Sequence, residues 1–191
     1  SVKSYEAQHG ELNPENEDDV KLIEKFLWDS KKDRNQTTQK SLVENGQLQN
    51  GIVTVDGKIV DGNRRAMLLN SIKNNPAFPI TSHGDANYFN AVILDSKGTE
   101  KELLHLETYY QMGQDEKLGY NPIEKYLKCH TLKDSGFSED DISKLMNENP
   151  GKIKEWLETY EVMEQYLEHY GYTDIFTMLE KREDLFLTLN K

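Results

Sequence analysis

Short runs of β-branched residues lie in the front half of this chain, whereas the rear half repeats apolar residues only at helical spacing. Residues 52–55 and 58–60 flank Asp56-Gly57, and Asp-Gly between β-branched residues is a strong hairpin signal. An apolar run at 88–94, closed by a turn at 95–98, predicts a third, buried strand. Together these runs predict a small mixed sheet.

Helices are expected around these strands. The first follows Asn16 and Asp18, either of which is a suitable N-cap, and carries an apolar stripe at 20–27. A charged connector at 29–36 leads to the second helix, which ends at Asn45-Gly46 with the glycine as its C-cap. The third helix carries apolar residues at 66–72 and directly follows the second strand. The resulting order α–α–β–β–α–β indicates an α+β fold.

Only helices are predicted after residue 98. They cover residues 100–113, 121–133, a short segment capped by Ser138, a long stripe from Ile153 to Tyr170, and residues 174–189. The short and long helices at 138–160 follow each other as in a helix-turn-helix unit. We therefore divide the chain into an α+β domain at 1–98 and an all-helical domain at 99–191. No further structural element is predicted after the last helix, which is what we expect of a chain that is truncated at its C-terminus.

Asp61-Gly62-Asn63-Arg64-Arg65 stands where the second strand ends and a helix begins. The N–H groups and the dipole of a helix start attract anions. Gly62 lets the backbone approach a ligand closely, and the two arginines offer planar forks that match phosphate oxygens. Two of the four arginines of the chain are placed here, although cations oppose the dipole of a helix start. The pattern predicts a phosphate site rather than a surface turn.

Asp61 has two interpretations. As an ion-pair partner it would orient Arg64, and as a metal ligand it would lie near the Mg²⁺ that accompanies a triphosphate. The sequence shows no clear group of carboxylates for a two-metal site.

The charge and composition of the chain limit the classes of partner that it is expected to bind. The formal net charge is −11, and residues 134–191 hold 14 acidic against 6 basic residues. This balance opposes strong binding of duplex DNA, because such binding rests on neutralised phosphates. DNA would have to meet the side of Arg64 and Arg65. No apolar run reaches the ~20 residues of a membrane helix, and the single Cys129 cannot form an internal disulfide, so we expect a cytoplasmic protein without membrane contact.

The start of the long helix offers Lys152 and Lys154 as DNA contacts. The same helix then carries carboxylates that would repel phosphates: Glu155, Glu158, Glu161 and Glu164. Packing or a protein interface is the alternative, and in an interface Trp156, Tyr160 and Met163 would be exposed. The five histidines have no metal-ligand spacing, and Cys129 lacks a partnered base for nucleophilic chemistry.

Several segments, taken in their order along the chain, resemble the motifs of a known protein family. The matching segments are 13–14, 45–55, 58–66, 106–111 with 121–124, and 136–142. Within them, Gly62-Asn63-Arg64-Arg65 is similar to the Gly-Glu-Arg-Arg or Gly-Asn-Arg-Arg motif of the ParB/sulfiredoxin superfamily, and more narrowly of its ParB-like "nuclease" domain group. Asn121-Pro122 and the Gly136-Phe137-Ser138 helix start are similar to later motifs of that group. The phosphate motif contains no cysteine, so sulfiredoxin chemistry is not implied.

The resemblance implies a ParB-like nucleotide-binding domain with an attached helical domain, in plasmid partition or the biology of a mobile element. ParB proteins bind and hydrolyse CTP, so the expected ligand is CTP or ATP with Mg²⁺ and the expected activity is that of a CTPase or NTPase. Gly62, Asn63, Arg64 and Arg65 would bind the phosphates. Glu107 would be a metal or pocket residue.

Two other functions stay open. In a metal-dependent DNA nuclease, Asp61, Glu107 and a metal would cleave the phosphodiester. In a non-catalytic interaction module, the helical domain would bind a protein partner or self-associate.

Overall fold

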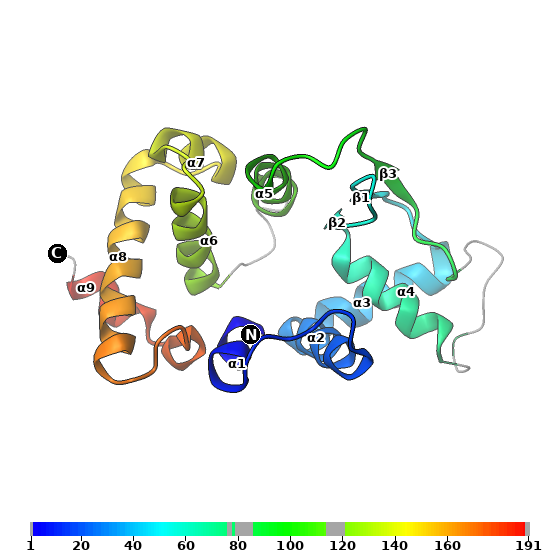
Figure 1. Ribbon diagram of the computed structural model, residues 1–191, viewed down its shortest axis with the longest axis horizontal. Coiled ribbons are helices and arrows are strands. Elements are labelled where there is room, and N and C mark those ends of the chain that lie inside the picture. Colours follow the sequence, from blue (N-terminus) through cyan, green and yellow to red (C-terminus); the bar gives the residue numbers. More distant parts are fainter. Residues whose placement is uncertain (1, 76–77, 79–85, 114–120, 190–191) are drawn as a thin grey trace. The chain divides into compact units, whose positions relative to one another are not determined.

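The computed structural model describes residues 2–75, 78, 86–113 and 121–189 as an α+β protein with many helices and one small mixed sheet (Figure 1). The chain forms two compact units. Asn13–Leu103 form the first, here called the sheet unit, and Ser1–Leu12 with Leu104–Lys191 form the second, the helical unit. This division differs from the expected one at 98/99, because the first twelve residues group with the helical unit and the boundary falls inside a helix.

The sheet unit contains three strands and three complete helices in its described part. These are α2 (Glu17–Ser30), α3 (Lys32–Asn45), β1 (Gly51–Val53), β2 (Ile59–Asp61), α4 (Asn63–Lys73) and β3 (Ala91–Ile93), followed by the start of α5 (Glu100–Thr108). Its core is formed by α3 and α4: Leu42, Met67, Leu68, Leu69 and Ile72 are buried there. Helix α4 therefore presents an apolar face to α3 while its first turn stays at the end of β2.

The predicted hairpin is confirmed: β1 and β2 pair antiparallel, and Gly57 has a φ of +88° in the turn between them. Strand β3 pairs parallel to β1, giving the order β2-β1-β3. The prediction that the third strand is buried is wrong. Val92 and Ile93 are 53% and 67% exposed, because β3 is an edge strand and an apolar run looks the same on an edge as in a centre.

The Asn16 cap is confirmed, since its side chain accepts hydrogen bonds from the N–H groups of Asp18 and Asp19. The prediction of a charged connector at 29–36 is wrong. Helix α2 continues to Ser30, and α3 begins at Lys32. Lys, Arg and Gln are good helix formers, so the charged stretch belongs to a helix rather than to a loop. The predicted glycine C-cap is confirmed at Gly46, whose N–H donates to the Leu42 carbonyl.

The helical unit is built from the remaining elements. They are α1 (Val2–His9), the end of α5, the π-helix η1 (Tyr109–Gly113), α6 (Pro122–Asp134), α7 (Glu139–Met146), α8 (Pro150–His169), the 3₁₀ helix η3 (Phe176–Leu179) and α9 (Glu183–Leu189). The predicted cap at Ser138 is confirmed, and Asn121 and Ser138 each form a capping box at the start of their helix. The single helix expected over 174–189 is wrong, because η3 and α9 are separated by Lys181, whose φ is +66°.

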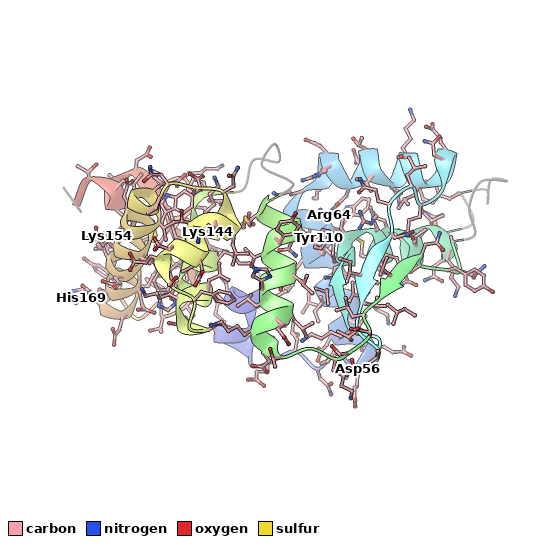
Figure 2. All side chains as sticks on the ribbon, turned by 90° about the horizontal axis from the view of Figure 1, so that it is seen from above. Asp56, Arg64, Tyr110, Lys144, Lys154 and His169 are labelled. Carbon is pink, nitrogen blue, oxygen red and sulfur yellow. The ribbon has the colours of Figure 1, made fainter. Side chains whose placement is uncertain are left out.

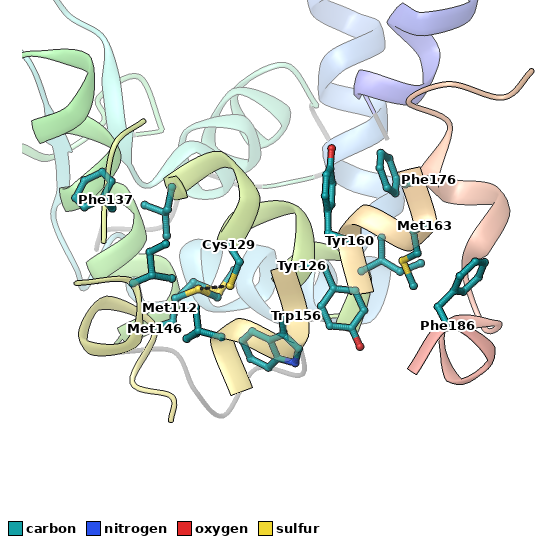
Figure 3. Close-up of a cluster of buried hydrophobic side chains, with 14 of the residues drawn as sticks. Met112, Tyr126, Cys129, Phe137, Met146, Trp156, Tyr160, Met163, Phe176 and Phe186 are labelled. Atoms are coloured by element: carbon teal, nitrogen blue, oxygen red, sulfur yellow. Dashed lines mark hydrogen bonds between the residues drawn. The ribbon is translucent and has the colours of Figure 1, made fainter. Parts of the chain in front are cut away.

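One apolar core joins α6, α7 and α8 (Figure 3). Among the residues that the structure describes, those buried in this core are Met112, Ile123, Tyr126, Cys129, Leu132, Phe137, Ile142, Leu145, Met146, Ile153, Trp156, Tyr160, Met163, Leu167, Phe176, Leu179 and Phe186. The predicted stripe of α8 is confirmed from Ile153 to Leu167, but Tyr170 at the helix end is exposed. The predicted helix-turn-helix segment consists of α7 and the first part of α8, with Asn147 in the left-handed region between them. DNA recognition by this segment stays a prediction.

Candidate phosphate-binding site

The strand-to-helix junction lies where it was predicted. Strand β2 ends at Asp61, Gly62 follows with a φ of +100°, and α4 begins at Asn63. The Gly62 carbonyl accepts the first hydrogen bond of the helix from the Ala66 N–H, at 2.9 Å. A glycine has no side-chain acceptor, so the N–H groups of the first turn receive no capping hydrogen bond from this residue. A helix start of this kind favours an anion.

Arg65 connects the first turn of α4 to the strands. Its Nη2 lies 3.0 Å from Asp61 Oδ2 and 3.3 Å from the Asn50 carbonyl, and its Nη1 lies 3.1 Å from Gln49 Oε1. The expected ion pair of Asp61 therefore forms, but with Arg65 in place of Arg64. Both side chains are about three-quarters buried or more, with exposed fractions of 20% and 26%. The carboxylate offsets the charge of Arg65 and fixes its guanidinium.

Arg64 is oriented by a different kind of partner. Its Nη1 donates to Oδ1 of Asn35, a fully buried residue of α3. The Asn35 amide group in turn donates to the carbonyls of Leu27 and Trp28 at the end of α2, at 3.1 and 2.7 Å. An amide oxygen carries no net charge, so this contact orients the guanidinium without neutralising it. Sequence reasoning does not identify Asn35, because the charged segment 29–36 predicts a connector rather than a helix.

Phe89 is the second residue that sequence reasoning missed. A methyl group built on Gly62 would lie 2.7 Å from Phe89 Cζ, and one built on Gly51 would lie 2.2 Å from the same atom. The edge of the ring therefore fills the space beside both glycines. Gly62 was expected to admit a ligand, and the structure gives it two additional reasons to be glycine: its positive φ and the adjacent ring.

The segment that carries Phe89 is held by Gln47. The Gln47 side chain donates to the Asn90 carbonyl at 2.6 Å and accepts from the Asn90 N–H at 2.8 Å. It thus pairs with the backbone beside β3 as a neighbouring strand would. This pairing fixes the approach of Phe89 to the junction.

The two predicted metal ligands belong to different units of the chain. Glu107 is a residue of the helical unit, where its carboxylate lies 3.0 Å from Lys128 Nζ, whereas Asp61 belongs to the sheet unit and pairs with Arg65. Over residues 2–75, 78, 86–113 and 121–189, no three His, Cys, Asp or Glu side chains are placed to hold a metal ion. A Mg²⁺ ion that accompanies a nucleotide would be held at least in part by phosphate oxygens of the ligand.

The predicted DNA contacts at the start of α8 are paired with acids. Lys152 Nζ lies 2.9 Å from Glu155 Oε1, and Lys154 Nζ lies 3.8 Å from Glu158 Oε1. These i,i+3 and i,i+4 pairs offset the positive charge that phosphates would need. Figure 2 marks Lys154 on this helix.

The apolar residues expected on an interaction surface are in the core. Trp156, Tyr160 and Met163 are at most 5% exposed, so the expectation that they form a surface is wrong. Cys129 is fully buried with its Sγ 3.3 Å from Met146 Sδ. Burial raises the pKa of its thiol to about 12, so the thiol is protonated at neutral pH and is no nucleophile.

Comparison of the sequence with models of known protein families finds no match, and comparison with curated proteins finds no relative. Among the described helices, none is both long and apolar enough to span a bilayer.

Proposed function

We propose that the sheet unit binds a nucleoside triphosphate at the first turn of α4. The observation that supports this most directly is the placement of Arg64 and Arg65 on a helix start opened by Gly62, with each guanidinium oriented by a neighbouring side chain. Oriented donors at a helix start are suited to phosphate oxygens. The resemblance of the junction to the ParB-like phosphate motif supports the same ligand class.

The charge balance favours a nucleotide over a DNA backbone. The sheet unit holds 14 acidic and 12 basic residues, a net charge of −2, whereas the helical unit holds 20 and 11, a net charge of −9. DNA binding requires the neutralisation of many phosphates along an extended surface. Two adjacent arginines and one helix start suit the compact charge of a triphosphate.

The two arginines should have different roles. Arg65 is paired with Asp61 and bonded to Gln49 and Asn50, so it mainly ties α4 to the strands. Arg64 is oriented by the buried amide of Asn35, which connects it to α2 and α3. We therefore expect the loss of Arg65 to reduce the stability of the strand-to-helix junction as well as the binding.

Binding is tested by thermal unfolding of the full chain with CTP, ATP or GTP, each with Mg²⁺, and with a short DNA duplex in a separate arm. A ligand at one hundred times its Kd stabilises the native state by about 2.7 kcal/mol, which raises the Tm by several degrees. The change Arg64→Gln should abolish the shift. The change Arg182→Gln, at an exposed arginine of the helical unit, is the matched control and should preserve it.

A chain whose Tm responds to no nucleotide contradicts the proposal. So does a shift that survives Arg64→Gln. A shift with the duplex alone would assign the arginines to a DNA backbone.

A further inference from the structure

Strand β3 forms an outer edge of the sheet, beside β1 (Figure 1). The Gly51 N–H of β1 donates to the carbonyl of Asn90, at 2.8 Å, rather than to that of Ala91, its partner in the register. In a parallel ladder of this phase, residues 90, 92 and 94 bond to β1 and the residues between them face away from it. The N–H and C=O groups of Ala91 and Ile93 therefore point to the open edge, where no other described residue bonds to them.

This edge carries exposed apolar side chains on both faces of the sheet. Val92 and Ile93 point to opposite faces, because side chains alternate along a strand, and they are 53% and 67% exposed. Natural sheets protect an open edge with charged residues, proline or a bulge. Residues 86–94 contain no charged residue and no proline, and β3 pairs with β1 in a regular register. The edge of β3 is therefore suited to receive another strand.

A carboxylate lies at the end of this edge. Asp95 is exposed and follows the last residue that bonds to β1. No described lysine, arginine or histidine lies within 4.0 Å of its carboxylate. The nearby cation Lys97 is paired with Asp56, at 3.5 Å. Opposite charges across a strand pair are stabilising, so Asp95 favours a basic residue on an added strand.

We infer that β3 binds an extended segment of a partner protein as an additional antiparallel strand, with apolar residues opposite Val92 and Ile93 and a lysine or arginine opposite Asp95. An extended main chain supplies the alternating donors and acceptors that this edge lacks. A second copy of the chain fits less well. The register of two β3 strands that pairs Ala91 with Ile93 in both directions would place Asp95 opposite Phe89, and each copy carries a net charge of −11. The inference does not depend on the phosphate site.

The test uses the full chain and a fluorescently labelled peptide, Lys-Thr-Val-Ile-Val-Thr, whose binding is followed by fluorescence anisotropy. With the peptide lysine opposite Asp95 in an antiparallel register, the two valines lie opposite Ile93 and Ala91. N-methylation of either valine removes an N–H that would donate to β3, and should weaken binding at least about tenfold, a loss that corresponds to ~1.4 kcal/mol. N-methylation of the isoleucine, whose N–H points away from β3, should change the Kd less than about twofold.

Two variants of the chain test the same contacts from the other side. Ala91→Pro removes an N–H of the open edge and leaves the bonds to β1 in place, because proline is tolerated on an edge strand. It should weaken binding at least about tenfold. Asp95→Asn should weaken binding of the lysine peptide but not of a peptide with threonine in place of the lysine. Glu15→Gln, at an exposed position elsewhere in the sheet unit, removes the same charge and is the matched control.

Circular dichroism shows whether each variant is folded, and the N-methylated peptides test the edge on the unaltered chain. Equal losses for all three N-methylated peptides would overturn the inference, as would unchanged binding to a folded Ala91→Pro variant. Light scattering supplies the last outcome. Concentration-dependent dimerisation that Ala91→Pro abolishes would assign the edge to a second copy instead of a partner protein.

Discussion

The two units of the chain are stabilised by different interactions. In its described part, the helical unit buries one large apolar cluster centred on α6 and α8. Over the residues of the sheet unit that the structure describes, the corresponding cluster has five buried members. Beside that cluster the sheet unit buries polar groups: Asn35 is bonded to Arg64 and to two carbonyls of α2, and Gln39 lies 3.3 Å from Ser71. Hydrogen bonds between buried polar groups therefore provide part of the stability of the sheet unit, whereas apolar packing stabilises the helical unit.

This difference bears on where a ligand can bind without disturbing the fold. Apolar packing is non-directional, and its contribution scales with buried area. A hydrogen bond to a charged group contributes about 1.5–3 kcal/mol and depends on direction. In the sheet unit the side chains that would meet a phosphate are also those that connect α2, α3 and α4. Changes at the candidate site should therefore affect binding and stability together, whereas changes in the helical core should affect stability alone.

The largest effect should come from the helical core. Trp156→Ala removes a buried ring that contacts Tyr126 and lies under the Lys125 ammonium group, 5.1 Å from the ring centroid. We expect a loss of about 3–5 kcal/mol in the free energy of unfolding, measured by urea denaturation. Tyr170→Ala, at the exposed C-cap of the same helix, should change it by less than about 0.5 kcal/mol. Similar losses for the two variants would show that the apolar core is not what holds the helical unit.

A smaller loss of stability is expected from a substitution at the strand-to-helix junction. Gly62→Ala places a methyl group at a φ of +100° and 2.7 Å from Phe89 Cζ, and strain of this kind costs about 1–3 kcal/mol. Gly57→Ala is the matched control, because its φ is +88° and nothing lies within 4 Å of the added methyl. The Gly62 variant should lose more stability in denaturant unfolding. Combining it with Phe89→Ala should remove most of the difference, and a purely additive double variant would contradict the close contact.

The smallest expected effect is a change in the pKa of Asp56 in the hairpin turn. The Thr54 hydroxyl donates to Asp56 at 2.6 Å and lowers the pKa of that carboxyl, with a lesser contribution from Lys97 at 3.5 Å. Asp56 therefore adds stability above its unfolded-state pKa, and this is lost as the pH falls through its lower folded-state pKa. Thr54→Val should raise the Asp56 pKa in an NMR titration more than Lys97→Gln does. The reverse order would place the cause in the ion pair.

Local signals were sufficient for several elements of the fold. Asp56-Gly57 predicted the hairpin, and Asn16, Asn121 and Ser138 predicted helix starts, because a turn or a cap is decided by neighbours in sequence. Exposure of β3 was not predicted, since the position of a strand within its sheet depends on its pairing with distant strands. The connector assigned to 29–36 failed because charge alone does not distinguish a loop from a polar helix.

Only those residues of the candidate site that are adjacent to one another in the sequence could be predicted. The sequence identified Gly62 and the arginine pair, and the structure places them at a helix start as expected. It could not identify their partners. Asn35 lies 29 residues before Arg64, and Phe89 meets Gly51 and Gly62 only after β1 and β3 have paired. Contacts of this range are set by tertiary packing rather than by local spacing.

The ring of Phe89 between Gly51 and Gly62 also constrains how this sequence can diverge. Neither glycine can acquire a side chain until residue 89 has become smaller, because the ring already occupies the space that a methyl group would need. At position 51 the backbone must also shift, because the methyl group would lie 2.8 Å from the Asp61 carbonyl oxygen. Substitutions at these three positions are therefore expected to be accepted in a fixed order during evolution. In homologous chains, a side chain larger than hydrogen at position 51 or 62 should be accompanied by a smaller residue at position 89.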